Sequence, residues 1–187
     1  MLLHNKESER IIFKNITEND FEIWMEFASD PEAVKYFPPV ANPSEMVRNW
    51  LDRCKMRYEK YGFGMYSLTD KNTGEYVGQC GILVQEIEGE NYLEVGYHLL
   101  TKHRKKGYAT EAATFCRDYA FKNNMLDLPL IGAAGKKGVI SIIHPENLNS
   151  QAVAKRNGMT KERTVPWKDV PHCIFTITQK EWEFVSR

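Results

Sequence analysis

A basic turn at residues 104–110 is the stretch of this sequence best suited to bind a ligand. It reads Arg-Lys-Lys-Gly-Tyr-Ala-Thr and follows an alternating apolar stretch typical of a strand, and the residues after it have helical spacing. The first N–H groups of a helix have no partner within it, and the helix dipole adds positive charge there. Gly107 and Ala109 add little bulk, so a ligand can approach the backbone. The turn therefore suits a phosphate or diphosphate, although a solvated basic loop before an ordinary helix fits the same pattern.

Glu94, in the predicted strand before this turn, is the candidate general base. Along that strand the apolar Leu93 and Val95 alternate with Glu94. A carboxylate in an otherwise apolar strand is costly unless it is exposed, paired or used in chemistry. The alternative is a carboxylate at the rim of a solvent-facing strand. His98 is four residues after Glu94, so in a regular strand both side chains would point to the same face. His98 ranks below Glu94 as a base, because a β-bulge between them would turn the two side chains to different faces.

Three motifs in the chain resemble those of the GCN5-related N-acetyltransferase (GNAT) family. The turn matches the R/Q-x-x-G-x-G/A loop that binds the acetyl-CoA pyrophosphate in that family. Glu94–Leu99 and Gly107–Ala112 resemble the E-[IV]-G-Y-x-L strand and G-Y-A-T-E-A turn of its ribosomal-protein N-terminal acetyltransferases, the Rim group. The segment 147–159 resembles the second acetyl-CoA-binding segment. The resemblance covers nearly the whole chain.

This resemblance implies one α/β (α+β) domain over residues 1–187, with helices around a mixed, mostly antiparallel sheet whose middle strands, 92–100 and 139–144, splay apart. It implies that acetyl-CoA is the cosubstrate and that a primary amine attacks it directly in a ternary complex. Cofactor contacts are then expected at the following residues: His98, Leu99, Leu100, Arg104, Lys105, Lys106, Gly107, Tyr108, Ala109, Thr110, Asn147 and Ser150.

The resemblance also assigns the rest of the catalytic and acceptor sites. Ser150 is expected to hydrogen-bond the leaving sulfur, because the position where many relatives carry a tyrosine acid is Ala154 here. The alternative for Ser150 is an ordinary serine in the first turn of a helix. The acceptor pocket is expected at the segments that contain Tyr36, Phe37 and Trp167.

A peptide α-amine is the favoured acceptor. The pKa of an α-amine lies near 8, so roughly a quarter of it is already neutral at cytosolic pH. The neutral fraction of a lysine side chain is about a thousandfold smaller, so an enzyme that modifies lysine must supply about 4 kcal/mol more to obtain the neutral amine. A site with one carboxylate and no tyrosine acid fits the α-amine more easily. The alternatives are a small amine, such as a polyamine, an antibiotic or an amino-acid derivative, and a non-catalytic regulator that binds acyl-CoA.

The remaining secondary structure is predicted from periodicity and from capping residues. The segment 126–138 is longer than the usual connection between a helix and a strand, and 164–171 is predicted to be a proline-bounded loop. Strands are expected at 9–16, 63–69, 75–85, 92–100, 139–144 and 173–177, and a further strand is expected around Lys161 and Arg163. Helices are expected after Thr17, from Asn42 to Gly62, from Tyr108 to Asn123, before Gly158 and after Thr178.

Composition narrows the class of protein. The 187 residues include 25 Lys and Arg and 25 Asp and Glu, for a net charge of zero, which disfavours nucleic acid and anionic membranes as partners. The four cysteines form no C-x-x-C pair, so neither a metal site nor a disulfide framework is expected. The N-terminal residues do not resemble a signal peptide. We expect a soluble cytoplasmic protein that is a monomer or a homodimer.

Overall fold

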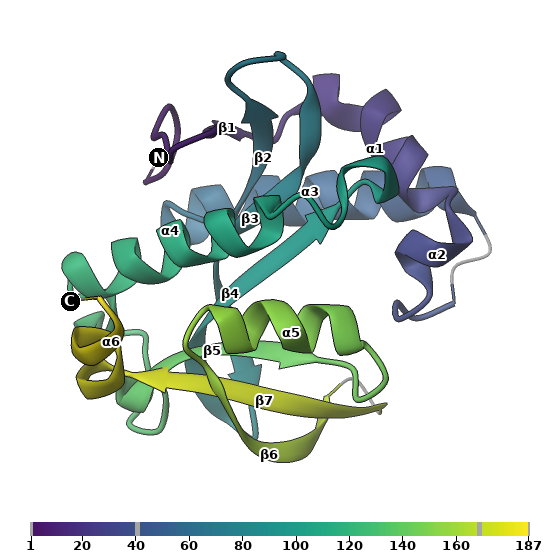
Figure 1. Cartoon of the computed structure of the whole chain (residues 1–187). Coiled ribbons are helices and arrows are strands. Elements are labelled where there is room, and N and C mark those ends of the chain that lie inside the picture. The colour runs from purple at the N-terminus through teal and green to yellow at the C-terminus, as the bar shows by residue number, and fades with distance from the viewer. Residues whose placement is uncertain (1, 40–41, 168–169, 187) are drawn as a thin grey trace. The chain divides into compact units, whose positions relative to one another are not determined.

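The computed structural model describes residues 2–39, 42–167 and 170–186. Its seven strands form one mixed sheet in the order β1-β2-β3-β4-β5-β7-β6 (Figure 1). The strands are β1 (Ile11–Asn15), β2 (Met65–Asp70), β3 (Tyr76–Ile87), β4 (Glu90–Leu99), β5 (Gly138–Ile143), β6 (Thr160–Trp167) and β7 (Val170–Thr178). The helices are α1 (Phe21–Ala28), α2 (Pro31–Val34), α3 (Pro43–Tyr61), α4 (Tyr108–Lys122), α5 (Leu148–Arg156) and α6 (Gln179–Val185). The pair β4–β5 is parallel, and β1–β2, β2–β3, β5–β7 and β6–β7 are antiparallel. The predicted fold class is confirmed.

The chain divides into two compact units, and the first comprises residues 1–81 and 97–112. In this unit α3 lies against β2 and β3 (Figure 1). Two polar contacts join these elements: the Trp50 indole donates to the Gln79 side chain at 2.7 Å, and the Tyr58 hydroxyl donates to the Met65 carbonyl. Buried aromatic residues fill the space between α1 and α3, where Trp24 is 1% exposed. This aromatic cluster reaches the end of β4, because the Trp24 ring centre lies 6.4 Å from that of His98.

Local capping explains the bounds of α3. The Asn42 side chain accepts a hydrogen bond from the Ser44 amide at 3.0 Å, and Pro43 occupies the first helical position. Gly62 ends the helix at φ 77°, in the left-handed region. Both ends agree with the prediction. The helix predicted between Thr17 and Tyr36 is divided: α1 ends at Ala28, and the short helix α2 begins after Asp30, which accepts from the Glu32 amide at 2.9 Å.

The second unit comprises residues 82–96 and 113–187. Its long 126–138 segment, unexplained by the sequence, covers part of the sheet. The Gly132 amide donates to the Asn91 carbonyl, and the Asn91 side chain donates to the Leu130 carbonyl. Ala134 packs against a buried apolar cluster on β3–β7 that includes Ile140. The segment therefore holds the β3–β4 hairpin and completes the core of this unit.

The prediction of a loop over 164–171 was wrong for its described residues. They belong to a hairpin in which β6 and β7 pair with Pro166 opposite Pro171. Proline is tolerated here because β6 is an edge strand, and β5 pairs with β7 only from Cys173 onward. Residues 168 and 169 lie outside the described part of the chain.

No helix in the described ranges is both long enough and apolar enough to cross a membrane.

Candidate functional site

The turn predicted to bind phosphate has an unusual backbone conformation in the first unit. Lys105 has φ 62° and Gly107 has φ 89°, both in the left-handed region. Such a conformation is costly for a lysine, and strained residues of this kind cluster at functional sites. The Glu111 amide donates to the Gly107 carbonyl and closes the first turn of α4, so the amides just before it have no acceptor within the helix. Left-handed residues beside a helix start form a concave group of N–H donors that suits an anion.

A contact that the sequence analysis missed fixes this turn to the β2–β3 connection. The Tyr108 hydroxyl donates to the Asp70 carboxylate at 2.6 Å, and Asp70 also accepts from the amides of Asn72 and Thr73. The hydrogen bond from Tyr108 lowers the pKa of Asp70, and the same bond raises the pKa of Tyr108. The side chain of Tyr108 is thus used to hold the turn.

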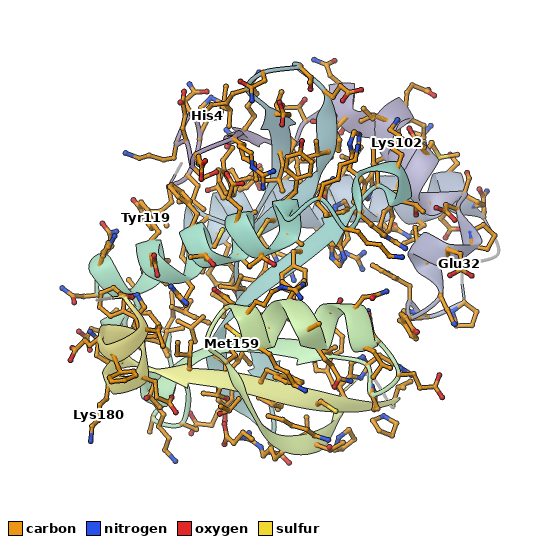
Figure 2. The ribbon with its side chains drawn as sticks, viewed as in Figure 1. His4, Glu32, Lys102, Tyr119, Met159 and Lys180 are labelled. Carbon is orange, nitrogen blue, oxygen red and sulfur yellow. The ribbon has the colours of Figure 1, made fainter. Side chains whose placement is uncertain are left out.

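The basic residues at the turn differ in their surroundings. The Lys102 ammonium lies 2.9 Å from the Glu26 carboxylate, and Arg104 donates to the Glu32 carbonyl at 3.4 Å; Figure 2 labels Lys102 and Glu32 in this unit. Lys105 and Lys106 are exposed. These two lysines therefore remain best placed to meet a phosphate from solvent.

The end of β4 carries other residues of the first unit that are predicted to contact the cofactor. The Leu100 amide donates to the Val77 carbonyl, and the Leu100 carbonyl accepts from the His103 amide. Both main-chain groups of Leu100 are therefore already used. His98 and Leu99 lie on β4 itself, opposite Gly78, where a Cβ would meet the His98 carbonyl at 2.3 Å.

Aromatic rings surround the imidazole of His98. Its ring centre lies 5.2 Å from that of Phe37, 5.3 Å from Trp50 and 5.8 Å from Phe27. Burial lowers the pKa of His98 to about 4, and the positive charge of Arg104 acts in the same direction. The imidazole is therefore neutral near pH 7, and Phe37, a predicted acceptor contact, lies against it. Tyr36 is half-buried beside Phe37.

We expect His98 to make the protein less stable in acid. Above pH 6.5 the imidazole is neutral in both the folded and the unfolded chain. Between about pH 6.5 and 4 the unfolded chain binds a proton that the folded chain does not, so stability is lost as the pH falls. From pH 7 to 4.5 the melting temperature of the wild type should drop about 5 °C more than that of His98→Gln. His4→Gln, at an exposed histidine, is the control, and equal drops in the wild type and His98→Gln would contradict the assignment.

Glu94 lies in the second unit, at the point where the backbone pairing of β4 with β5 ends. It is 7% exposed, and its carboxylate accepts from the Gln85 side chain at 2.8 Å and from the Ile142 amide at 3.4 Å. Leu93 of β4 pairs with Val139 of β5, and Glu94 pairs with Ile140, in parallel orientation. One residue further, the Ser141 hydroxyl donates to the Val95 carbonyl at 2.7 Å. Glu94 is therefore a buried, oriented carboxylate and not a solvated rim residue.

The second predicted cofactor segment forms the start of α5. The Asn147 side chain caps this helix by accepting from the Ser150 amide at 3.1 Å. Ser150 lies in the first turn, a position that both of its predicted roles allow. Trp167, at the end of β6, packs edge-on against His172 with ring centres 5.2 Å apart. It belongs to the second unit, whereas Tyr36 and Phe37 belong to the first.

Within the ranges that the structure covers, no three His, Cys, Asp or Glu side chains are grouped to hold a metal ion.

The profile of the acetyltransferase (GNAT) domain matches residues 10–160. The chain belongs to this acetyltransferase family. The Bacillus subtilis (strain 168) protein YkkB is 31% identical over 147 residues, which are 79% of each chain. The acetyltransferase from Agrobacterium tumefaciens strain C58 is 27% identical, with a TM-score of 0.69 over 91% of this chain and 92% of its own.

A second similar structure was solved in complex with coenzyme A. It is RimL, a ribosomal L7/L12 α-N-protein acetyltransferase in complex with coenzyme A, which is 15% identical, with a TM-score of 0.67 over 95% of this chain and 98% of its own. At that identity the likeness shows the fold alone. Acetyl-CoA is the usual cosubstrate of GNAT enzymes.

Proposed function

We propose that this GNAT enzyme transfers the acetyl group of acetyl-CoA to the α-amine of a protein or peptide, by direct attack of the amine in a ternary complex. The observation that carries this proposal is the buried carboxylate of Glu94. It accepts a hydrogen bond from the Gln85 side chain and lies where the β4–β5 pairing ends. We also propose that the whole chain is one N-acetyltransferase domain, since β3 and β4 each have residues in both compact units.

The turn at 104–110 fits the diphosphate of the cofactor. Its left-handed residues Lys105 and Gly107 offer N–H donors, its exposed lysines offer positive charge, and Gly107 adds no side chain. Bound acetyl-CoA supplies an activated thioester carbonyl. Glu94 takes the proton of the attacking amine, directly or through water, and so keeps the amine neutral for attack.

Ser150 is proposed to donate a hydrogen bond to the departing sulfur. A serine hydroxyl is too weak an acid to protonate a thiolate efficiently, so its contribution is to stabilise the negative charge. The amide of Ser150 is bonded to Asn147, which fixes the serine in the first turn of α5. Ala154, where many relatives carry a tyrosine acid, is fully buried.

Two features support an α-amine as the acceptor. A site with one general base and no tyrosine acid suits an amine whose pKa is near 8 better than one near 10.4. The partly exposed Phe37 ring lies 5.2 Å from the neutral His98 imidazole, and this apolar contact suits a peptide side chain better than a highly charged polyamine.

The test is release of free thiol from acetyl-CoA with two panels of acceptors, short peptides with free N-termini and small amines. Matched peptides with acetylated N-termini are the control, because any internal lysine remains available in them. We expect turnover with free N-termini and none with the blocked peptides. Turnover confined to the small amines would overturn the acceptor class. If acetyl-CoA raises the melting temperature while no acceptor reacts, the protein is a binding module.

A further inference from the structure

A second carboxylate, Glu111, lies in the first turn of α4, beside the proposed diphosphate site. It accepts three hydrogen bonds from the N-terminal segment: from the Ser8 hydroxyl at 2.6 Å, the Arg10 amide at 2.7 Å and the Arg10 Nε at 2.7 Å. Burial raises the pKa of Glu111, but these hydrogen bonds outweigh it and lower the pKa overall. Glu111 is thus a charged group tied to the residues just before β1.

The Arg10 guanidinium extends from this carboxylate across the turn. Its Nη1 donates to the Lys106 carbonyl at 3.1 Å, and its carbon lies 4.8 Å from the centre of the Tyr108 ring. A Cβ added to Gly107 would lie 3.1 Å from Arg10 Nη2. Arg10 therefore contacts three consecutive residues of the turn as well as the first turn of α4.

This arrangement resolves an electrostatic conflict. A carboxylate in the first turn of a helix interacts favourably with the exposed amides there, as a bound phosphate does. An unpaired Glu111 would therefore compete with the diphosphate and repel it. The bonds from Arg10 and Ser8 hold the carboxylate to one side and neutralise it. The bond to the Lys106 carbonyl fixes that peptide group within the strained turn.

We propose that Arg10 is a positioning residue for the cofactor: it pairs with Glu111 and holds the Lys106 carbonyl, so that the amides of the turn stay directed at the diphosphate. This inference rests on the proposed placement of the diphosphate at residues 104–110. Arg10 acts through the turn and not on the reacting atoms.

The experiment compares binding of coenzyme A and of pantetheine, which lacks the diphosphate and nucleotide, by calorimetry, without an acceptor. Arg10→Lys keeps the charge but cannot make the same contacts to Glu111, Lys106 and Tyr108. We expect the affinity for coenzyme A to fall about tenfold and the affinity for pantetheine to stay unchanged. Glu111→Gln should weaken coenzyme A binding similarly. The double variant should bind hardly more weakly than either single variant, because both substitutions disrupt the same Arg10–Glu111 interaction.

Arg163→Lys is the matched control. Arg163 on β6 also pairs with a carboxylate, that of Glu162 at 2.7 Å, and also lies over a tyrosine ring, that of Tyr92 at 5.8 Å. We expect no change in coenzyme A affinity for this variant.

Two results would overturn the role of Arg10: an unchanged affinity for coenzyme A in Arg10→Lys, or an equal loss for coenzyme A and pantetheine, which would indicate general damage to the fold. Gly107→Val separates this inference from the placement of the diphosphate. If Gly107→Val leaves coenzyme A binding intact, the diphosphate does not bind at this turn and both proposals fail. If Gly107→Val weakens binding while Arg10→Lys does not, only the role of Arg10 is lost.

Discussion

Replacing Glu94 by glutamine should lower kcat about 100-fold near pH 7, with less than a twofold change in the affinity for acetyl-CoA. The amide has nearly the size of the carboxylate and can still accept from the Gln85 side chain, which lies 2.8 Å from Glu94. It cannot take a proton, and positioned general bases contribute typically 10²- to 10⁴-fold. Initial rates with a peptide acceptor and calorimetry with acetyl-CoA measure the two effects.

The pH dependence sharpens this prediction. Because Glu94 is proposed to keep the amine neutral, the deficit of Glu94→Gln should narrow as the pH rises past about 8, where an α-amine is mostly neutral. Glu162→Gln is the control in the same unit, since Glu162 accepts from the Thr176 hydroxyl at 2.6 Å on β6–β7. Unchanged turnover in Glu94→Gln, or an equal loss in Glu162→Gln, would show that Glu94 is not the base.

Features that depend on neighbouring residues were predictable from the sequence. Asn42 and Pro43 set the start of α3 and Gly62 its end through local capping, and all three were predicted. The capping box at Thr178 likewise places α6. The strand β4 and the turn after it follow from alternation and from Gly107. The fold class could also be predicted, because these local motifs occur along the chain in the order typical of one family.

Features that depend on distant residues were not predictable. Tyr108 and Asp70 are 38 residues apart in sequence, and Glu111 and Arg10 are 101 apart. Nothing around Arg10 indicates that its side chain reaches the turn. The end of β6 and the start of β7 were predicted as a loop for a related reason. Proline normally disfavours a strand, and only the sheet order shows that Pro166 lies on an edge strand.

The substitution Gly107→Val should reduce the affinity for coenzyme A at least 100-fold while the protein remains folded. At φ 89° a β-branched residue is strained whatever space surrounds it. Its Cβ would also lie 3.1 Å from Arg10 Nη2. The turn would relax toward negative φ, and its amides would no longer point to a common centre. The affinity is measured by calorimetry and the fold by thermal unfolding.

Gly62→Val controls for backbone strain in this prediction. Gly62 has φ 77°, and an added Cβ would meet nothing within 4 Å, so the backbone penalty is similar but lies at the end of α3. Both variants should lose stability by about 1–3 kcal/mol, and only Gly107→Val should lose coenzyme A binding. Because the two glycines share their conformation and differ in position, equal affinities in the two variants would place the diphosphate elsewhere. A loss confined to Gly107→Val ties the cofactor to the amides between β4 and α4, beside the left-handed residues Lys105 and Gly107.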